Sequence, residues 1–326
     1  MSLLEVRDLH VWFDLPEGGE LHAVQGVSLD LDAGERTGLV GESGCGKTTI
    51  VLSLLGLLPP SATVSGDVRF EGESILVGSE EAMQAHRWKD ISMVFQGAMN
   101  ALNPVKTVLA QIVEPMEFHG TAEGAESRTR AGDLLEMVGI PAAAGSRYPH
   151  EFSGGMRQRA ALAMALACEP KVLLADEPTT ALDVMVQAQI LELLVRLAEE
   201  LDLALVLVTH DLPVVAQVCE RAVVMYAGEV VESGPMDALF HAPRHPYTRL
   251  LFAATPSLHG EEAVLSIPGT PPRLDVEIVA CPFHPRCDRV FDRCRIERPV
   301  LKPIDDRRRA ACHLNDDWAS VGRGEG

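Results

Sequence analysis

One stretch of the sequence combines glycines, a lysine and hydroxyl groups at a spacing that suits phosphate binding, Gly41-Glu42-Ser43-Gly44-Cys45-Gly46-Lys47-Thr48-Thr49. The glycines let backbone N–H groups curl around a phosphate, and a helix start adds the positive end of its dipole. Lys47 can reach the β- and γ-phosphates, and the Thr48 hydroxyl is a suitable Mg²⁺ ligand. A predicted strand before the stretch and a predicted helix after it complete the pattern. We therefore predict a nucleotide site made of Gly41, Ser43, Gly44, Cys45, Gly46, Lys47, Thr48 and Thr49.

Two carboxylates close a short apolar run at residues 171–175. Asp176 and Glu177 follow that run, and strand ends of a parallel sheet are where ligands bind. We expect Asp176 to hold Mg²⁺ and Glu177 to polarise the attacking water as a general base. The alternative is that the two acids cap a following helix, but a phosphate loop in the same chain favours a role in hydrolysis.

A second anion-binding helix start is predicted at Ser153, Gly154 and Gly155, ahead of a helix over 156–167. Exposed N–H groups at such a start suit a γ-phosphate. In isolation, the same residues are typical of an N-cap with a flexible lead-in.

The elements that must position these residues alternate between strand and helix. Strands are predicted at 3–11, 21–31, 36–40, 64–70, 91–95, 171–175, 203–209, 223–226 and 229–232. Helices are predicted at 48–58, in parts of 100–139, at 156–167 and at 186–201. This order predicts an α/β fold with a mostly parallel sheet covered on both faces, interrupted by a helical insert.

Further residues complete a resemblance to the ABC ATPase family. Gln96 resembles the glutamine of the Q-loop, Ala181-Leu182-Asp183 the D-loop, and His210 the switch histidine, while 153–156 resembles the signature motif. The resemblance implies a P-loop NTPase (RecA-like) core with an antiparallel β subdomain and an inserted helical subdomain. It also implies ATP and Mg²⁺ as cofactors, with Gln96 as a further Mg²⁺ ligand and Glu177, His210 and Gln96 as the catalytic set.

Two positions leave alternatives open. Phe13 lies where the family keeps an aromatic ring that stacks on adenine, although Trp12 is its neighbour. Cys45 occupies a position that is often filled by Ser. It could be a modifiable thiol, because the start of a helix lowers the pKa of a thiol. We favour the alternative that it is a small residue tolerated at this position. Phe152 and Met156 also depart from the common signature, but neither removes a phosphate ligand or the base.

The resemblance covers residues 1–255, which we assign to a nucleotide-binding domain with a helical insert at about 98–160. In the family, ATP lies in a dimer interface, so that Ser153 would act on the ATP of the partner subunit. ATP then joins two subunits and hydrolysis releases them, which can drive a mechanical partner.

Residues 256–326 are assigned to a small C-terminal module that holds Cys281, Cys287, Cys294 and Cys312, with five, six and seventeen residues between them. Zinc hooks are usually tighter, and four thiolates at looser spacing suit an iron–sulfur cluster. Zinc and plain thiols or disulfides are the alternatives. The segments 245–249 and 281–287 resemble the C-terminal extension of oligopeptide/dipeptide ABC importer ATP-binding subunits, a group associated with a 4Fe–4S cluster. We expect such a cluster at these four cysteines, where it would stabilise the module.

Composition narrows the function further. The 326 residues are 47% hydrophobic and carry a net charge of −19, which excludes a disordered chain and disfavours nucleic acid as a partner. We expect an ATP-hydrolysing subunit of an oligopeptide/dipeptide importer, peripheral at the cytoplasmic face of the membrane. Its implied partners are a second, paralogous ABC ATPase subunit, two permease subunits and an extracytoplasmic substrate-binding protein. The alternatives are an importer for nickel or glycosides and, with less support, a soluble non-transport ABC ATPase.

Overall fold

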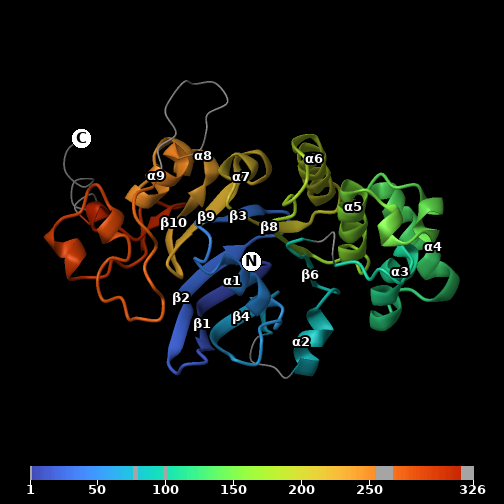
Figure 1. Cartoon of the computed structure of the whole chain (residues 1–326), viewed down its shortest axis with the longest axis horizontal. Helices are drawn as coiled ribbons and strands as arrows, with labels where there is room; N and C mark the ends of the chain where they lie inside the picture. The colour runs from blue at the N-terminus through green and yellow to red at the C-terminus, as the bar shows by residue number, and fades with distance from the viewer. Residues whose placement is uncertain (1, 76–79, 98–100, 255–266, 317–326) are drawn as a thin grey trace. The chain divides into compact units, whose positions relative to one another are not determined.

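The computed structural model describes residues 2–75, 80–97, 101–254 and 267–316 (Figure 1). These residues form two compact units, each built from separate stretches of the chain. Unit 1 comprises Met1–Leu3, Leu31–Arg36 and Glu73–Val208, and unit 2 comprises Leu4–Asp30, Thr37–Gly72 and Thr209–Gly326. None of the described helices has the length and apolar character that a membrane crossing needs.

Unit 2 contains an antiparallel sheet and the antiparallel edge of a second, mixed sheet. In the first, β1 (Leu4–Asp14) lies between β2 (Glu20–Leu31) and β4 (Ala62–Phe70). In the second, the order is β11-β12-β10-β9-β3, and β3 (Arg36–Val40) pairs in parallel with β9 (Arg221–Tyr226). The remaining strands, β10 (Glu229–Pro235), β11 (Lys302–Pro303) and β12 (Arg309–Ala310), are antiparallel.

The C-terminal region joins unit 2 through this sheet. Strand β12 pairs with β10, so that Ala310 lies opposite Glu232 and Arg309 opposite Ser233. Figure 1 shows the same region, in red, beside β10 and α9. The helices of the unit are α1 (Lys47–Leu54), α7 (Leu212–Val218), α8 (Met236–His241) and α9 (Pro246–Ala253), with 3₁₀ turns η4 (His284–Arg286), η5 (Asp292–Arg295) and η6 (His313–Asn315).

Unit 1 holds three parallel strands, in the order β8-β7-β6: β6 (Ile91–Val94), β7 (Val172–Asp176) and β8 (Ala204–Thr209). Every residue of these strands is buried, as expected for parallel strands that are covered on both faces. The two-residue strand β5 (Glu73–Ser74) begins the longest stretch of this unit. The predicted α/β class is confirmed, and the sheet is mixed because β10 pairs antiparallel with β9 and with β12, and β12 pairs antiparallel with β11.

The helical pattern of the insert resolves into separate helices, whose ends follow from local residues. Helix α3 (Val108–His119) begins at Thr107, whose hydroxyl accepts a hydrogen bond from the N–H of Ala110, and ends at Gly120 in the left-handed conformation. The other helices of unit 1 are α2 (Glu80–His86), α4 (Gly124–Met137), α5 (Gly154–Ala165) and α6 (Val184–Glu200), with 3₁₀ turns η2 (Ala142–Ser146) and η3 (Pro149–Glu151). Helices α3, α4 and α5 pack together, as the green part of Figure 1 shows.

Candidate functional site

The predicted phosphate loop lies between β3 and α1, and its backbone requires glycine. Gly46 is the N-cap of α1 with a φ of 102°, and a Cβ atom there would lie 2.6 Å from the backbone oxygen of Ala23. Both the left-handed φ and the lack of space therefore exclude a side chain at this position. Ser43, Gly44 and Thr48 are exposed, so the loop is open to a ligand from solvent.

Lys47 points into the loop rather than into solvent. Its side chain is buried, and Nζ donates to the backbone oxygens of Gly41 at 2.8 Å and Glu42 at 3.0 Å. The ammonium is thus held beside the backbone of the loop, where an anion bound by the loop would meet it. The role of Lys47 in phosphate binding stays a prediction from the sequence.

Cys45 lies within the same loop, but its thiol is not activated. Only 5% of the residue is exposed, and burial raises the pKa of its thiol. The Lys47 ammonium lies 3.7 Å from the sulfur and works in the opposite direction with smaller effect. The structure therefore favours the interpretation of Cys45 as a small packing residue over that of a reactive thiol.

Sequence reasoning missed the residues that hold Glu42. The N–H of Glu42 donates to the hydroxyl of Tyr247 at 2.9 Å, and its carboxylate forms an ion pair with Arg286 at 2.6 Å. Tyr247 lies on α9 and Arg286 on η4. No local pattern in the sequence indicates such contacts, because the partners lie far apart along the chain.

The carboxylates at the end of β7 differ in their surroundings. Asp176 is 1% exposed, whereas Glu177 is half-buried with a φ of 44°. The Glu177 carboxylate accepts hydrogen bonds from Gln96 Nε2 at 2.9 Å and Thr180 Oγ1 at 3.0 Å. A positive φ at a residue other than glycine costs about 1–3 kcal/mol and is typical of functional positions. The structure thus brings together two predicted catalytic residues, Gln96 and Glu177, and adds Thr180.

The predicted signature residues lie at the exposed start of α5. Ser153 is the N-cap, and its hydroxyl accepts from the N–H of Met156 at 3.3 Å. A Cβ atom on Gly155 would lie 2.7 Å from Val186 Cγ1, which explains why no side chain occurs there. The N–H groups of Gly154 and Gly155 begin a helix of 12 residues, so that its start can bind an anion.

The remaining predicted site residues, Phe13 and His210, lie at the ends of two different strands. Phe13 lies near the end of β1 opposite Ala62, half-buried. The Trp12 ring stacks on His22 at a centroid distance of 4.6 Å, and consecutive residues of a strand face opposite sides. The Trp12 ring is therefore already stacked on His22, and Phe13 remains the residue that we predict to stack on adenine. His210 follows β8 directly and is exposed.

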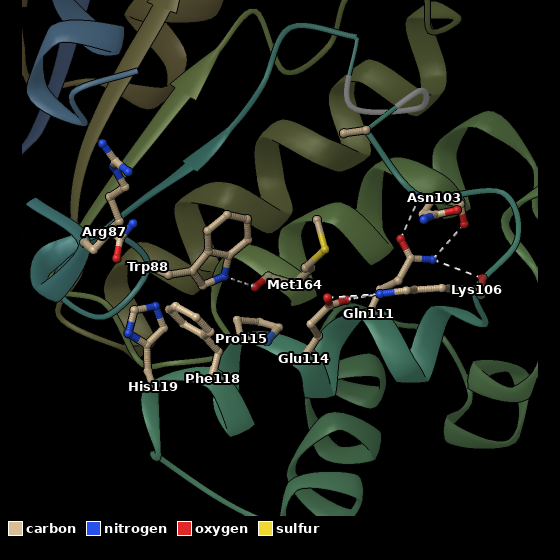
Figure 2. Close-up of a pocket in the computed structure, with 12 residues that line it drawn as sticks. Arg87, Trp88, Asn103, Lys106, Gln111, Glu114, Pro115, Phe118, His119 and Met164 are labelled. Carbon is tan, nitrogen blue, oxygen red and sulfur yellow. Dashed lines mark hydrogen bonds and ion pairs between the residues drawn. The ribbon is translucent and has the colours of Figure 1, made fainter. Parts of the chain in front are cut away.

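Unit 1 also carries a cavity of about 580 Å³ beside α3 (Figure 2). The rings of Trp88, Phe118 and His119 gather at one end, and the amides of Asn103 and Gln111 at the other. The indole N–H of Trp88 donates to the backbone oxygen of Met164 at 2.8 Å, while the Phe118 ring is 73% exposed. The cavity is lined by Gln84, Arg87, Trp88, Ala101, Asn103, Lys106, Gln111, Glu114, Pro115, Phe118, His119 and Met164.

The predicted iron–sulfur centre is wrong. In the described parts of the chain, no group of three or more His, Cys, Asp or Glu side chains is arranged to hold a metal ion. Cys281, Cys287, Cys294 and Cys312 are free thiols, and burial raises the pKa of Cys281 to about 11 and that of Cys312 to about 12. Neither the 4Fe–4S cluster nor the zinc alternative therefore has a set of ligands among the described residues.

Comparison with known proteins gives the relationships of the chain. The ABC transporter family matches residues 24–180, and the "Oligopeptide/dipeptide transporter, C-terminal region" matches residues 231–294. The dipeptide transport ATP-binding protein DppD of Escherichia coli is 44% identical over 323 residues, covering 98% of each chain. The oligopeptide transport ATP-binding protein OppD of Bacillus subtilis is 49% identical over 278 residues, covering 83% of this chain and 77% of its own.

A solved structure supports the fold assignment. A dimeric ATP-binding cassette in a post-hydrolysis state, bound to ADP and Pi, matches with a TM-score of 0.63 and 31% identity over 72% of this chain and 98% of its own. The phosphate loop, the signature segment and the two carboxylates lie within the first family match, and Tyr247 and Arg286 lie within the second. The chain therefore belongs to the ABC transporter family, among the ATP-binding proteins of the oligopeptide/dipeptide group.

Proposed function

We propose that this protein hydrolyses ATP to power the transport of dipeptides or oligopeptides. The observation that carries the proposal is the similarity to a dipeptide transport ATP-binding protein along 98% of the chain. The named relatives favour peptides over nickel or glycosides and over a soluble non-transport ATPase. The buried lysine and the glycine-bounded loop fit a nucleotide phosphate, and hydroxyl and carboxylate oxygens are the ligands that Mg²⁺ prefers.

Each predicted residue has a role in this proposal. Backbone N–H groups of 41–49 and the Lys47 ammonium bind the phosphates, and Phe13 stacks on adenine. Thr48, Asp176 and Gln96 would serve as ligands of Mg²⁺, which would neutralise phosphate charge. Glu177, fixed by Gln96 and Thr180, accepts a proton from the attacking water, and His210 assists at the γ-phosphate.

In this proposal a second ATPase subunit, either a paralogue or a second copy, supplies the ATP that the signature segment at 153–156 contacts. Ser153 is exposed and Gly154 and Gly155 are half-buried, and in this proposal the Ser153 hydroxyl and the two glycine N–H groups bind the γ-phosphate held by the partner. The neighbouring start of α6 supports a partner surface, because Val184 is 78% exposed and Met185 72% exposed.

A permease contact is proposed at the cavity beside α3. Trp88, Pro115 and Met164 give it an apolar wall, and the exposed Phe118 stands at its rim, which suits a short apolar segment of a permease subunit. The protein would then lie at the cytoplasmic face of the membrane, with two permease subunits and an extracytoplasmic binding protein. Phe118→Glu should abolish co-purification with the permease, with ATP binding unchanged; retained co-purification contradicts this docking site.

In this proposal, residues 1–255 form the nucleotide-binding domain, with the helical insert at about 98–160, and residues 256–326 form the C-terminal extension. The test is uptake of a labelled dipeptide by cells of the source organism that lack the gene. The unaltered protein should restore uptake and Glu177→Gln should not. Restored uptake of nickel or a glycoside without peptide uptake contradicts the proposed substrate class.

A further inference from the structure

Arg286, in the C-terminal region, is joined to the phosphate loop across 244 residues of sequence. Its Nη1 donates to Glu42 Oε2 at 2.6 Å and its Nη2 donates to Glu42 Oε1 at 2.9 Å. These parallel bonds form a bidentate pair, the strongest geometry for a guanidinium and a carboxylate. The Arg286 side chain is only 3% exposed, so water competes little for it.

The guanidinium is held on its other sides as well. Its Nε donates to the backbone oxygen of Pro268 at 2.7 Å, and Nη1 also donates to the Tyr226 hydroxyl at 3.3 Å. The rings of Tyr226 and Phe283 lie with their centroids 5.7 Å and 5.9 Å from Cζ. Arg286 is therefore fixed before any nucleotide binds, and its hydrogen bond to Glu42 raises its pKa.

Tyr247 holds the backbone of the same loop residue. Its hydroxyl accepts from the N–H of Glu42 at 2.9 Å, and Tyr247 itself is fully buried. Burial raises the pKa of this phenol, so it stays neutral. The Tyr226, Tyr247 and Phe283 rings pack against one another at centroid distances of 4.7, 5.2 and 5.4 Å. Residue 42 is thus held at its main chain and its side chain by separate elements.

Glu42 also contacts Lys47, the residue that we propose binds the phosphates. The backbone oxygen of Glu42 accepts from Lys47 Nζ at 3.0 Å and from the N–H of Cys45 at 3.3 Å. A shift of residue 42 therefore moves an acceptor that orients Lys47. The carboxylate raises a second problem, because a negative charge beside a triphosphate site opposes binding unless a cation compensates it.

We propose that Arg286 is a positioning residue for ATP binding, which fixes Glu42 and cancels its charge beside the phosphate loop. The C-terminal region thereby sets the nucleotide affinity of the subunit. The inference rests on the proposed ATPase function, because it assigns a role toward the same bound nucleotide.

The test measures the Kd for ATP and the KM and kcat for hydrolysis of the full chain, for Arg286→Gln, Glu42→Gln and the double variant. Arg286→Gln should weaken ATP binding and raise KM about tenfold, with kcat within about twofold, because an unpaired negative charge then lies within the phosphate loop. The double variant should recover most of the affinity, since it lacks that charge. A purely structural arginine would show no such recovery. Arg293→Gln, which breaks exposed ion pairs with Glu297 and Asp316 in the same region, is the matched control and should bind ATP normally.

The outcomes separate this inference from the function it rests on. Failure of the unaltered protein to bind ATP contradicts the ATPase proposal itself. Normal binding by the unaltered protein together with an unchanged KM in Arg286→Gln overturns the role of Arg286, as does a double variant no better than the single one. If Arg286→Gln fails to fold, Arg286→Lys replaces it, because it keeps a positive charge near Glu42 but cannot form the bidentate pair that fixes the carboxylate. It should raise KM about threefold, and an unchanged KM overturns the positioning role of Arg286.

Discussion

The phosphate loop and the signature segment both use the start of a helix to bind phosphate, but they are built differently. The loop before α1 has no side-chain cap, and its lysine is buried, with Tyr247 and Arg286 holding Glu42 from far along the sequence. The signature segment caps itself, since the hydroxyl of Ser153 accepts from Met156 three residues on.

This difference indicates two roles. The phosphate loop is supported by contacts from distant parts of one unit, so it is preorganised to bind nucleotide within one chain. The signature segment is local and exposed, which suits a surface that is completed by a partner. The following substitutions test each side of the comparison.

Lys47→Ala should have the largest effect. It removes the cation that bonds to the phosphates, and charge-assisted bonds of this kind are worth about 1.5–3 kcal/mol each, so ATP affinity should fall about 100-fold or more. Titration calorimetry of the full chain gives the Kd. Lys106→Ala, whose exposed partner is Glu114, is the control and should bind ATP as the unaltered protein does.

Ser153→Ala should separate the two sides of the comparison. ATP affinity of the single chain should stay within about twofold, whereas turnover of the assembled transporter should fall about tenfold or more. Loss of the cap should lower the free energy of unfolding by about 1 kcal/mol. Ser153→Thr keeps a capping hydroxyl and should restore that stability; a weaker Kd for ATP in Ser153→Ala would show that the segment serves its own nucleotide site.

Low pH should lower the stability of the region around Tyr247, which holds the phosphate loop. Burial lowers the pKa of His245 from 6.5 to about 3, and its Nδ1 accepts from the N–H of Tyr247 at 3.0 Å. Because the unfolded state binds the proton more readily, His245 lowers stability as pH falls below about 6.5, by about 2 kcal/mol at pH 5. Denaturant unfolding at pH 7 and pH 5 measures this change.

The matched variant for that experiment is His245→Asn, which keeps an acceptor for Tyr247 but does not titrate in this range. It should lose the part of the pH dependence that His245 causes. An equal fall in stability for both proteins would show that other groups dominate.

Cys45→Ser should have the smallest effect. The residue is buried and its thiol is neutral, so ATP affinity should change less than about twofold. Reaction with a thiol reagent should be slow in the folded protein. Rapid, affinity-destroying modification at Cys45 would contradict its interpretation as a packing residue.

Local patterns predicted much of this molecule. The span of β3, Arg36–Val40, agrees with its apolar run, and the glycines around Lys47 predicted the loop because backbone geometry alone requires them. Only the family resemblance placed Gln96 in a catalytic set with Glu177, and the hydrogen bond between them, across 81 residues of sequence, was not predicted.

Contacts that depend on tertiary packing could not be predicted from the sequence. Tyr247 and Arg286 reach Glu42 across 205 and 244 residues, and no spacing rule reports such a distance. The cysteine spacing led to a wrong prediction for a related reason: spacing does not determine how side chains are arranged in space, and among the described residues no group of three or more His, Cys, Asp or Glu side chains is arranged to hold a metal ion.

The most direct test of the account is ATP turnover by purified Glu177→Gln beside its content of bound ATP. Glutamine keeps the size of the side chain and an acceptor for Gln96 and Thr180, but it cannot take a proton from water. Turnover should fall about 100-fold or more while ATP binding stays within about twofold. Turnover close to that of the unaltered protein would contradict Glu177 as the base and, with it, the proposed site.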